Sequence, residues 1–221
     1  KIEIWNCLNS IILLWIIINL VDVRTMNPSK TPFVNKFDLN DPYDSLLMVP
    51  GPTIVHSNVR KRMSNNQMGH LSGEFTENFK TLLKLSKKIF LTKLGHPFII
   101  TGSGTIAMEA AVLSLLEPND NGLILDTGYF AQRFVQMLSC YDIKSNIIPF
   151  EFGQHADPDI LKKAIRKYNP TAVFITHVDT SSTIMNNIEE LVNETKNTDT
   201  LTIVDSVCGV GGCELNFDKL G

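Results

Sequence analysis

Apolar runs alternate with helical stretches along the second half of the chain, and this alternation limits the folds that are open to it. The apolar runs cover residues 97–101, 122–126, 144–150, 171–176 and 200–204. The stretches between them have helical periodicity and cover residues 104–116, 128–140, 157–168 and 187–197. Such alternation is typical of a mainly parallel sheet with helices on both faces. The sequence therefore predicts an α/β fold.

The residues that follow the runs are the first place to look for a binding site. In a parallel sheet, ligands gather at the carboxyl ends of the strands. The segments at those ends are residues 102–105, 127–130, 177–183 and 205–207. They contain glycine, hydroxyl, aromatic and carboxylate side chains. We expect them to share one edge of the sheet.

The first 48 residues differ in composition from the rest. Residues 1–25 contain an apolar block that is too short for a transmembrane span of about 20 residues. We interpret them as not part of the working protein, with a targeting or anchoring segment as the alternative. Residues 26–48 are polar and rich in proline, which favours an extended arm. The remaining residues, 49–221, are expected to form one large domain.

Two further local signals precede the alternating region. Pro50 and Pro52 each fix the backbone angle φ and lack an N–H, so they predict a loop. Ser72 is a suitable N-cap for a helix that we expect to run as far as Gly95. Farther along, Asp157 is an N-cap candidate, and Pro158 suits the first position of its helix.

Charge and cysteine content exclude several classes of function. The 221 residues include 20 basic and 23 acidic ones, and no basic cluster is interleaved with aromatic residues. This pattern argues against nucleic acid as a partner. The four cysteines form neither a metal-ligand pattern nor a compact disulfide framework. We expect no metal and a reducing, intracellular compartment.

The glycine turn at residues 101–107 has two interpretations. Gly102, Gly104 and Ala107 match the G-x-G-x-x-A spacing of a dinucleotide fingerprint, and Asp126 follows about twenty residues later. An NAD-dependent dehydrogenase would bind pyrophosphate at this turn and ribose at the carboxylate. However, such a fingerprint normally lies on the first strand of its domain, whereas this turn follows a long helix and a proline loop.

The second interpretation replaces the dinucleotide by a compact phosphate. Free amides at a helix start, with the hydroxyls of Ser103 and Thr105, suit a phosphate monoester. The aromatic ring of Phe130 or Tyr129 is suited to stacking on a flat ring. Asp205 ends a very apolar run and is suited to pairing with a protonated ring nitrogen. A phosphate, a flat ring and a basic nitrogen together describe pyridoxal phosphate.

These residues also have purely structural interpretations. Ser103 and Thr105 are common helix caps, and Phe130 suits a core position. Asp205 is a frequent turn residue. Taken one at a time, the residues do not separate structure from function.

Taken in order, several motifs resemble the class V aminotransferases, with the closest likeness to the alanine–glyoxylate and serine–pyruvate branch. The motifs are residues 50–52, 68–70, 102–110, 128–133, 176–182 and 204–212. The resemblance runs from about Leu46 to Gly221. It implies the large domain of a fold type I pyridoxal-phosphate enzyme, incomplete at its C-terminus.

The resemblance assigns the phosphate and the substrate to separate groups of residues. It implies that Ser103, Gly104 and Thr105 bind the cofactor phosphate. Pro50 and Gly51 match a loop on the substrate side.

The resemblance also assigns the residues around the cofactor ring. Phe130 would stack on the ring, and Thr180 would contact the region of its hydroxyl group. Asp205 would hold the pyridinium nitrogen, and Val207 would line the other face. Two positions depart from the family: tryptophan is frequent at the position of Phe130, and glycine is usual at that of Thr183.

The family's catalytic lysine is expected after the end of this sequence. The Schiff-base lysine lies roughly ten residues beyond Gly221 by the usual spacing. Lys219 comes too early and in a different context. The arginine that binds the substrate carboxylate belongs to a small C-terminal domain that is also missing. We therefore expect this chain to be an N-terminal fragment without transaminase activity of its own.

For the complete protein, the resemblance implies a transaminase that acts on small amino and oxo acids. The amino group would move from alanine or serine to glyoxylate or pyruvate. We expect a homodimer, no membrane association for residues 26–221, and a cytoplasmic, mitochondrial or peroxisomal location that the sequence does not distinguish. The alternatives are the NAD-dependent dehydrogenase and a non-catalytic relative of the aminotransferases.

Overall fold

The computed structural model describes residues 48–221. The expectations for the leader at residues 1–25 and for residues 26–47 of the arm lie outside the described residues. The described chain divides into two compact units, one of residues 48–82 and one of residues 83–221. Across residues 48–221, every helix falls short of the length and apolarity that a bilayer crossing requires.

The smaller unit contains one short helix and the start of a longer one. Helix α2 (Ser57–Met63) was not anticipated from the sequence, because its residues are mostly polar and none is buried. Helix α3 (Gly73–Ile89) begins here and continues into the larger unit. The Ser72 hydroxyl accepts the Phe75 N–H at 3.1 Å, which confirms the predicted N-cap. The helix ends at Ile89 instead of Gly95.

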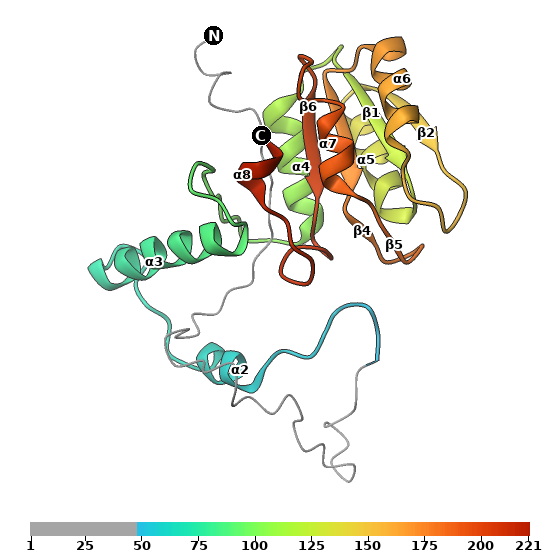
Figure 1. Ribbon diagram of the computed structural model, residues 1–221. Coiled ribbons are helices and arrows are strands. Elements are labelled where there is room, and N and C mark those ends of the chain that lie inside the picture. Colours follow the sequence, from blue (N-terminus) through green and yellow to red (C-terminus); the bar gives the residue numbers. More distant parts are fainter. Residues whose placement is uncertain (1–47) are drawn as a thin grey trace. The chain divides into compact units, whose positions relative to one another are not determined.

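Four parallel strands form the main sheet of the larger unit (Figure 1). They are β1 (Asn121–Asp126), β2 (Lys144–Pro149), β3 (Ala172–Thr176) and β6 (Leu201–Asp205), in the order β2-β1-β3-β6. Ile124 lies opposite Ile147 on one side and Phe174 on the other. The predicted α/β class with a mainly parallel sheet is confirmed.

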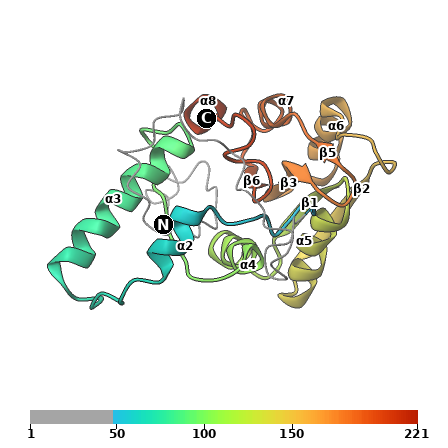
Figure 2. The same cartoon turned by 90° about the horizontal axis from the view of Figure 1, so that it is seen from below.

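Helices cover both faces of this sheet (Figure 2). Helices α4 (Gly104–Leu115) and α5 (Tyr129–Cys140) lie on one face. Helices α6 (Pro158–Tyr168), α7 (Ile188–Asn193) and α8 (Phe217–Leu220) lie on the other. Because side chains alternate along a strand, Phe174 packs in the α4/α5 core and its neighbour Ile175 packs in the α6/α7 core.

The apolar run at residues 97–101 was wrongly predicted to be a strand. These residues have no regular secondary structure, and the side chains of Phe98 and Ile100 are 59% and 40% exposed. A strand requires a neighbour with which to form its hydrogen-bond ladder. Within the described residues this segment pairs with no strand, so its apolar composition misled the prediction.

Residues 177–187 fold into a small hairpin that the sequence did not reveal. Strand β4 (Val178–Asp179) pairs antiparallel with β5 (Ile184–Met185). Two residues per strand are too few to give a periodic pattern. The hairpin begins directly after β3, and β4 contacts α5.

The helices on the α6/α7 face begin with caps from their own sequence. Asp157 Oδ1 accepts the N–H groups of Asp159 at 2.8 Å and Ile160 at 3.3 Å, as predicted. Asn187 caps α7 by accepting the Glu190 N–H at 3.4 Å. These side chains satisfy amide groups that a helix start leaves without partners.

Candidate cofactor site

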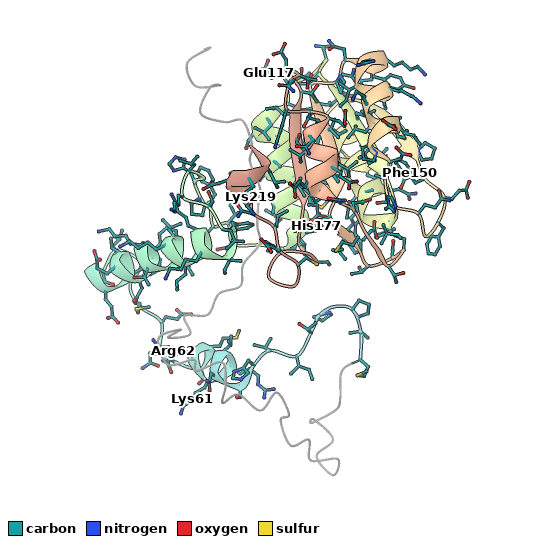
Figure 3. All side chains as sticks on the ribbon, viewed as in Figure 1. Lys61, Arg62, Glu117, Phe150, His177 and Lys219 are labelled. Carbon is teal, nitrogen blue, oxygen red and sulfur yellow. The ribbon has the colours of Figure 1, made fainter. Side chains whose placement is uncertain are left out.

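The carboxyl ends of the strands meet at one end of the larger unit. Figure 3 shows His177, directly after β3, at this end of the sheet and Glu117 at the opposite end. Thr176 and Asp205 are neighbours in the β3–β6 register. By alternation they share the α4/α5 face with Phe174 and Ile203, which belong to that core. The side chains at this edge therefore point toward the starts of α4 and α5.

Asp205 is a buried carboxylate. Its side chain is 9% exposed, and its Oδ1 accepts the Val207 N–H at 3.0 Å. Burial raises the pKa of the Asp205 carboxyl group, and the nearby negative charge of Asp179 adds to this effect. The ion pairs within residues 48–221 are Lys80–Glu77 and Lys162–Glu194, so no described cation neutralises Asp205. Such a site favours a cationic ligand.

Asp205 lines a small pocket together with the start of α4. The pocket lies between α4 and β6, and its walls include Gly104, Ala107 and Val207. A Cβ atom at Gly104 would lie 3.0 Å from Val207 Cγ2. The absence of a side chain at this glycine therefore allows the α4 start and the loop after β6 to approach closely.

The start of α4 carries hydrogen-bond donors that no side chain caps. Ser103 is the N-cap residue, but its hydroxyl makes no capping hydrogen bond. The N–H groups of Ile106 and Ala107 donate to the Ser103 carbonyl, which leaves the amides of Gly104 and Thr105 ahead of the first helical bond. Amides in this position, together with the helix dipole, suit an anion.

An arginine also reaches the start of α4. Arg133 Nη1, from α5, donates to Thr105 Oγ1 at 2.7 Å. The same guanidinium lies 5.7 Å from the centre of the Tyr129 ring. Arg133 belongs to the motif at residues 128–133, but the sequence left open whether it lies on the helix surface or near the phosphate, because a helix residue gives no signal of what it contacts across the fold.

Phe130 lies at the start of α5 beside the site. Its ring meets the Tyr129 ring edge to face at 5.5 Å between centres. Phe130 is half-buried, whereas the Tyr129 side chain is 53% exposed. Of the two aromatic candidates, Phe130 is therefore the more enclosed.

Thr180 lies in the β4–β5 hairpin and contacts the loop after β6. Its side chain forms a hydrogen bond with the Cys208 thiol. Burial and the charge of Asp205 raise the pKa of this thiol, against the lowering effect of that bond. Thr183, at which the family resemblance led us to expect glycine, has a φ of +59°, which places a β-branched residue in the left-handed region.

Contacts link most of the predicted residues into one group around the pocket. The Arg133–Thr105 bond joins α5 to α4, and Val207 against Gly104 joins α4 to the loop after β6. Thr180 joins that loop to the hairpin. Pro50 and Gly51 are exposed residues of the other unit.

The edge also holds two polar residues to which the sequence analysis gave no role. Thr176 is buried, and its Oγ1 has no hydrogen-bond partner within the described residues. Asp179 is fully buried and accepts a hydrogen bond from the Phe130 N–H at the start of α5. Both lie inside the motif at residues 176–182, but nothing in the sequence distinguishes them from ordinary loop residues.

His177 has a structural role in the described chain. Its Nδ1 lies 2.8 Å from Ser206 Oγ, and burial lowers the pKa of the imidazole. A Cβ atom at Gly209 would lie 2.4 Å from this Nδ1. His177 therefore packs tightly under the loop that carries Val207.

The geometry does not favour the dehydrogenase interpretation. A dinucleotide fingerprint joins a strand to a helix, whereas the segment before Gly102 forms no strand. Asp126, the ribose candidate, accepts a hydrogen bond from Gln132 Nε2 at 3.3 Å.

Comparison with known proteins gives a consistent result. The family profile described as "Aminotransferase class-V" matches residues 55–221. The chain is 34% identical over 180 residues to an uncharacterized aminotransferase of Methanocaldococcus jannaschii, covering 81% of this chain and 46% of that protein. It is 30% identical over 184 residues to alanine–glyoxylate aminotransferase 1 of Saccharomyces cerevisiae, covering 79% and 48%.

A solved structure has the same fold. The alanine–glyoxylate aminotransferase of Nostoc sp. superposes with a TM-score of 0.75 at 28% identity, over 80% of this chain and 47% of that one. The chain thus spans about half the length of the relatives that it matches. With a family match over most of its residues, this chain belongs to the class V aminotransferases.

Proposed function

We propose that the whole protein is a transaminase that moves an amino group from a small amino acid, alanine or serine, to glyoxylate or pyruvate. The similarity to alanine–glyoxylate aminotransferases supports this substrate class. The proposal includes a homodimer, and a Schiff-base lysine located after Gly221. This chain alone would then be inactive.

Pyridoxal phosphate is the cofactor of this family, and the residues present fit it. The uncapped start of α4 offers amides to a phosphate. The Thr176 hydroxyl, which has no hydrogen-bond partner in the part of the chain that the structure describes, lies beside Asp205 in the β3–β6 register, on the same face. Within the described residues, the amides at the start of α4 have no side-chain cap and the Thr176 hydroxyl has no hydrogen-bond partner. A phosphorylated pyridine can supply hydrogen-bond partners to both.

We assign the phosphate to Ser103, Gly104 and Thr105. The two amides at the start of α4 and the two hydroxyls are the donors, and Arg133 orients the Thr105 hydroxyl. Pro50 and Gly51 are assigned to the substrate side on the family resemblance.

We assign the ring to Phe130, Thr180, Asp205 and Val207. Phe130 and Val207 would enclose its two faces, and Thr180 would contact its hydroxyl group. When bound, the cofactor supplies an electron acceptor for the substrate carbon that loses a proton. Asp205 would keep a proton on the ring nitrogen, because a buried carboxylate without a cation stabilises a positive charge beside it.

The observation that carries the proposal is the burial of Asp205. A carboxylate that is only 9% exposed and has no described cationic partner is costly unless a ligand provides the positive charge. Function explains this residue better than stability does.

The test is Asp205→Asn in the whole protein. Asparagine keeps the shape and the acceptor for the Val207 N–H but removes the charge. We expect turnover with alanine and glyoxylate to fall about 100-fold or more, while some cofactor still binds. Normal turnover would sink the assignment. A wild-type protein that binds the cofactor but transfers no amino group would favour the non-catalytic relative.

Asp205→Asn, which should lower turnover, should raise the stability of the cofactor-free protein. The folded-state pKa of Asp205 is raised, so its protonated form is favoured and stability is lost as pH rises from about 3.9 through the folded value. The cofactor-free variant should therefore unfold at a higher temperature than wild type at pH 7. The difference should vanish below the unfolded pKa, which thermal melts at several pH values will measure.

A further inference from the structure

Helix α5 does not provide its own N-terminal cap. Its N-cap residue is Gly128, which has no side chain. The Phe130 N–H donates instead to Asp179 Oδ2 at 3.1 Å, and the Tyr129 N–H donates to Ser181 Oγ at 2.9 Å. Two amides at the start of α5 are thus bound by the β4–β5 hairpin, about fifty residues away in the sequence.

The second oxygen of Asp179 organises the hairpin itself. Asp179 Oδ1 accepts the Ser181 N–H at 3.0 Å and the Ser181 hydroxyl at 2.6 Å. These bonds close a turn whose middle residue is Thr180. One carboxylate therefore holds the backbone of Phe130 with one oxygen and the turn around Thr180 with the other.

The fit around this carboxylate is tight. Asp179 is fully buried, and a Cβ atom at Gly128 would lie 2.6 Å from its carboxylate carbon. The helix dipole of α5 stabilises the charge, and three donors surround it. Neither the carboxylate nor the helix start has room to shift independently of the other.

We propose that Asp179 is a positioning residue for the cofactor, because it fixes Phe130 and Thr180 relative to each other. This inference rests on the proposed function, in which Phe130 stacks on the ring and Thr180 contacts its hydroxyl group. Loss of Asp179 then weakens cofactor binding and turns the ring, beyond any loss of stability.

Asp157 provides a matched control. It is also an aspartate that caps a helix, accepting two amides at the start of α6. However, α6 lies on the opposite face of the sheet and holds none of the proposed cofactor residues (Figure 2). A purely structural cap affects stability in both places but affects binding in neither.

The experiment uses the whole protein without cofactor, with 4′-deoxypyridoxine 5′-phosphate as the probe. This analogue lacks the aldehyde oxygen, so it binds without a bond to lysine. Calorimetry gives its affinity, circular dichroism of the bound pyridine band reports ring orientation, and thermal melts give stability. The variants are Asp179→Ala, Asp179→Asn and Asp157→Ala.

We expect Asp179→Ala to bind the probe about tenfold more weakly than wild type, with an altered pyridine band. Asp157→Ala should lower the melting temperature but keep the affinity and the band. Asp179→Asn keeps one acceptor and should fall between wild type and Asp179→Ala. It also serves as the test variant if Asp179→Ala does not fold.

Two outcomes overturn the inference alone. One is wild-type affinity and an unchanged band in the Asp179 variants. The other is a loss of affinity in Asp157→Ala that matches the Asp179 variants at equal loss of stability. If the wild-type protein itself fails to bind the probe, the proposed function fails, and this inference fails with it.

Discussion

The two faces of the sheet start their helices differently. On the α6/α7 face, Asp157 and Asn187 cap the helices that directly follow them in the sequence. On the α4/α5 face, Ser103 makes no side-chain cap bond and Gly128 has no side chain to make one. The buried Asp205 also belongs to this second face, as does the Thr176 hydroxyl, which has no hydrogen-bond partner among residues 48–221.

The difference separates a face built for stability from a face available to a ligand. Local caps already bind the amides at the helix start in the free protein, so these amides are not available to a ligand. On the α4/α5 face, no side chain caps the donors at the start of α4 within the described residues, and the donors at the start of α5 are bound by Asp179 and Ser181 of the distant hairpin. Changes to the two faces should therefore have different consequences for stability and for binding.

The largest difference in stability is expected at Gly128. In Gly128→Ala, the added Cβ collides with the pinned carboxylate of Asp179, and the cap of α5 is disturbed. We expect the free energy of unfolding of the cofactor-free protein to fall by about 3 kcal/mol. Chemical denaturation measures this loss.

Gly212→Ala is the control for this change. A Cβ atom there would lie 3.5 Å from the Gly209 carbonyl oxygen, which is an ordinary contact. Its cost should stay below about 0.5 kcal/mol. Equal losses at both glycines would show that the distant cap of α5 has no special energetic role.

A smaller effect distinguishes the caps of α6 and α4. Asp157→Ala should cost about 1 kcal/mol of unfolding free energy, and Ser103→Ala less than about 0.5 kcal/mol, because Ser103 makes no cap bond. Binding of 4′-deoxypyridoxine 5′-phosphate should show the reverse order, with about fivefold weaker binding only in Ser103→Ala. Parallel changes in stability and affinity would remove the distinction between the two faces.

The smallest effect concerns left-handed residues. Thr183 has a φ of +59°, whereas Asn169, at the end of α6, has a φ of +43°. Threonine is strained in this region and asparagine tolerates it. Thr183→Gly should therefore stabilise the protein by about 0.5 kcal/mol, after the entropy cost of glycine.

Asn169→Gly should change stability less than Thr183→Gly. Thermal melts of the two variants, compared with wild type, make the test. A destabilised Thr183→Gly would mean that the hairpin tolerates its threonine without strain.

Much of the fold follows from the sequence because it depends on local patterns. The runs at β1, β3 and β6 are mostly apolar, β2 contributes the apolar pair Ile147 and Ile148, and the helices between them have periodic apolar positions. Residues 97–101 look like a strand but pair with none in the described chain, because pairing depends on a neighbour and not on composition. Helix α2 and the β4–β5 hairpin are too polar or too short to leave a pattern.

The site was only partly accessible from the sequence. Ser103, Thr105 and Asp205 could be selected because they follow strand-like runs or begin a helix. The contacts of Asp179 with Phe130 and of Arg133 with Thr105 join distant positions, and no local pattern encodes them. The exposure of Tyr129 relative to Phe130 likewise depends on how α5 packs.

The distant cap of α5 also bears on the order of folding during synthesis. Asp179 lies 49 residues after Phe130, so the start of α5 leaves the ribosome well before its cap exists. At about 5–20 residues per second, this interval is about 2–10 s. The entropy cost of closing so long a loop must be met before the hydrogen bond between Phe130 and Asp179 can stabilise the fold. The part of the larger unit proposed to hold the cofactor ring is therefore completed late, when the hairpin after β3 has emerged.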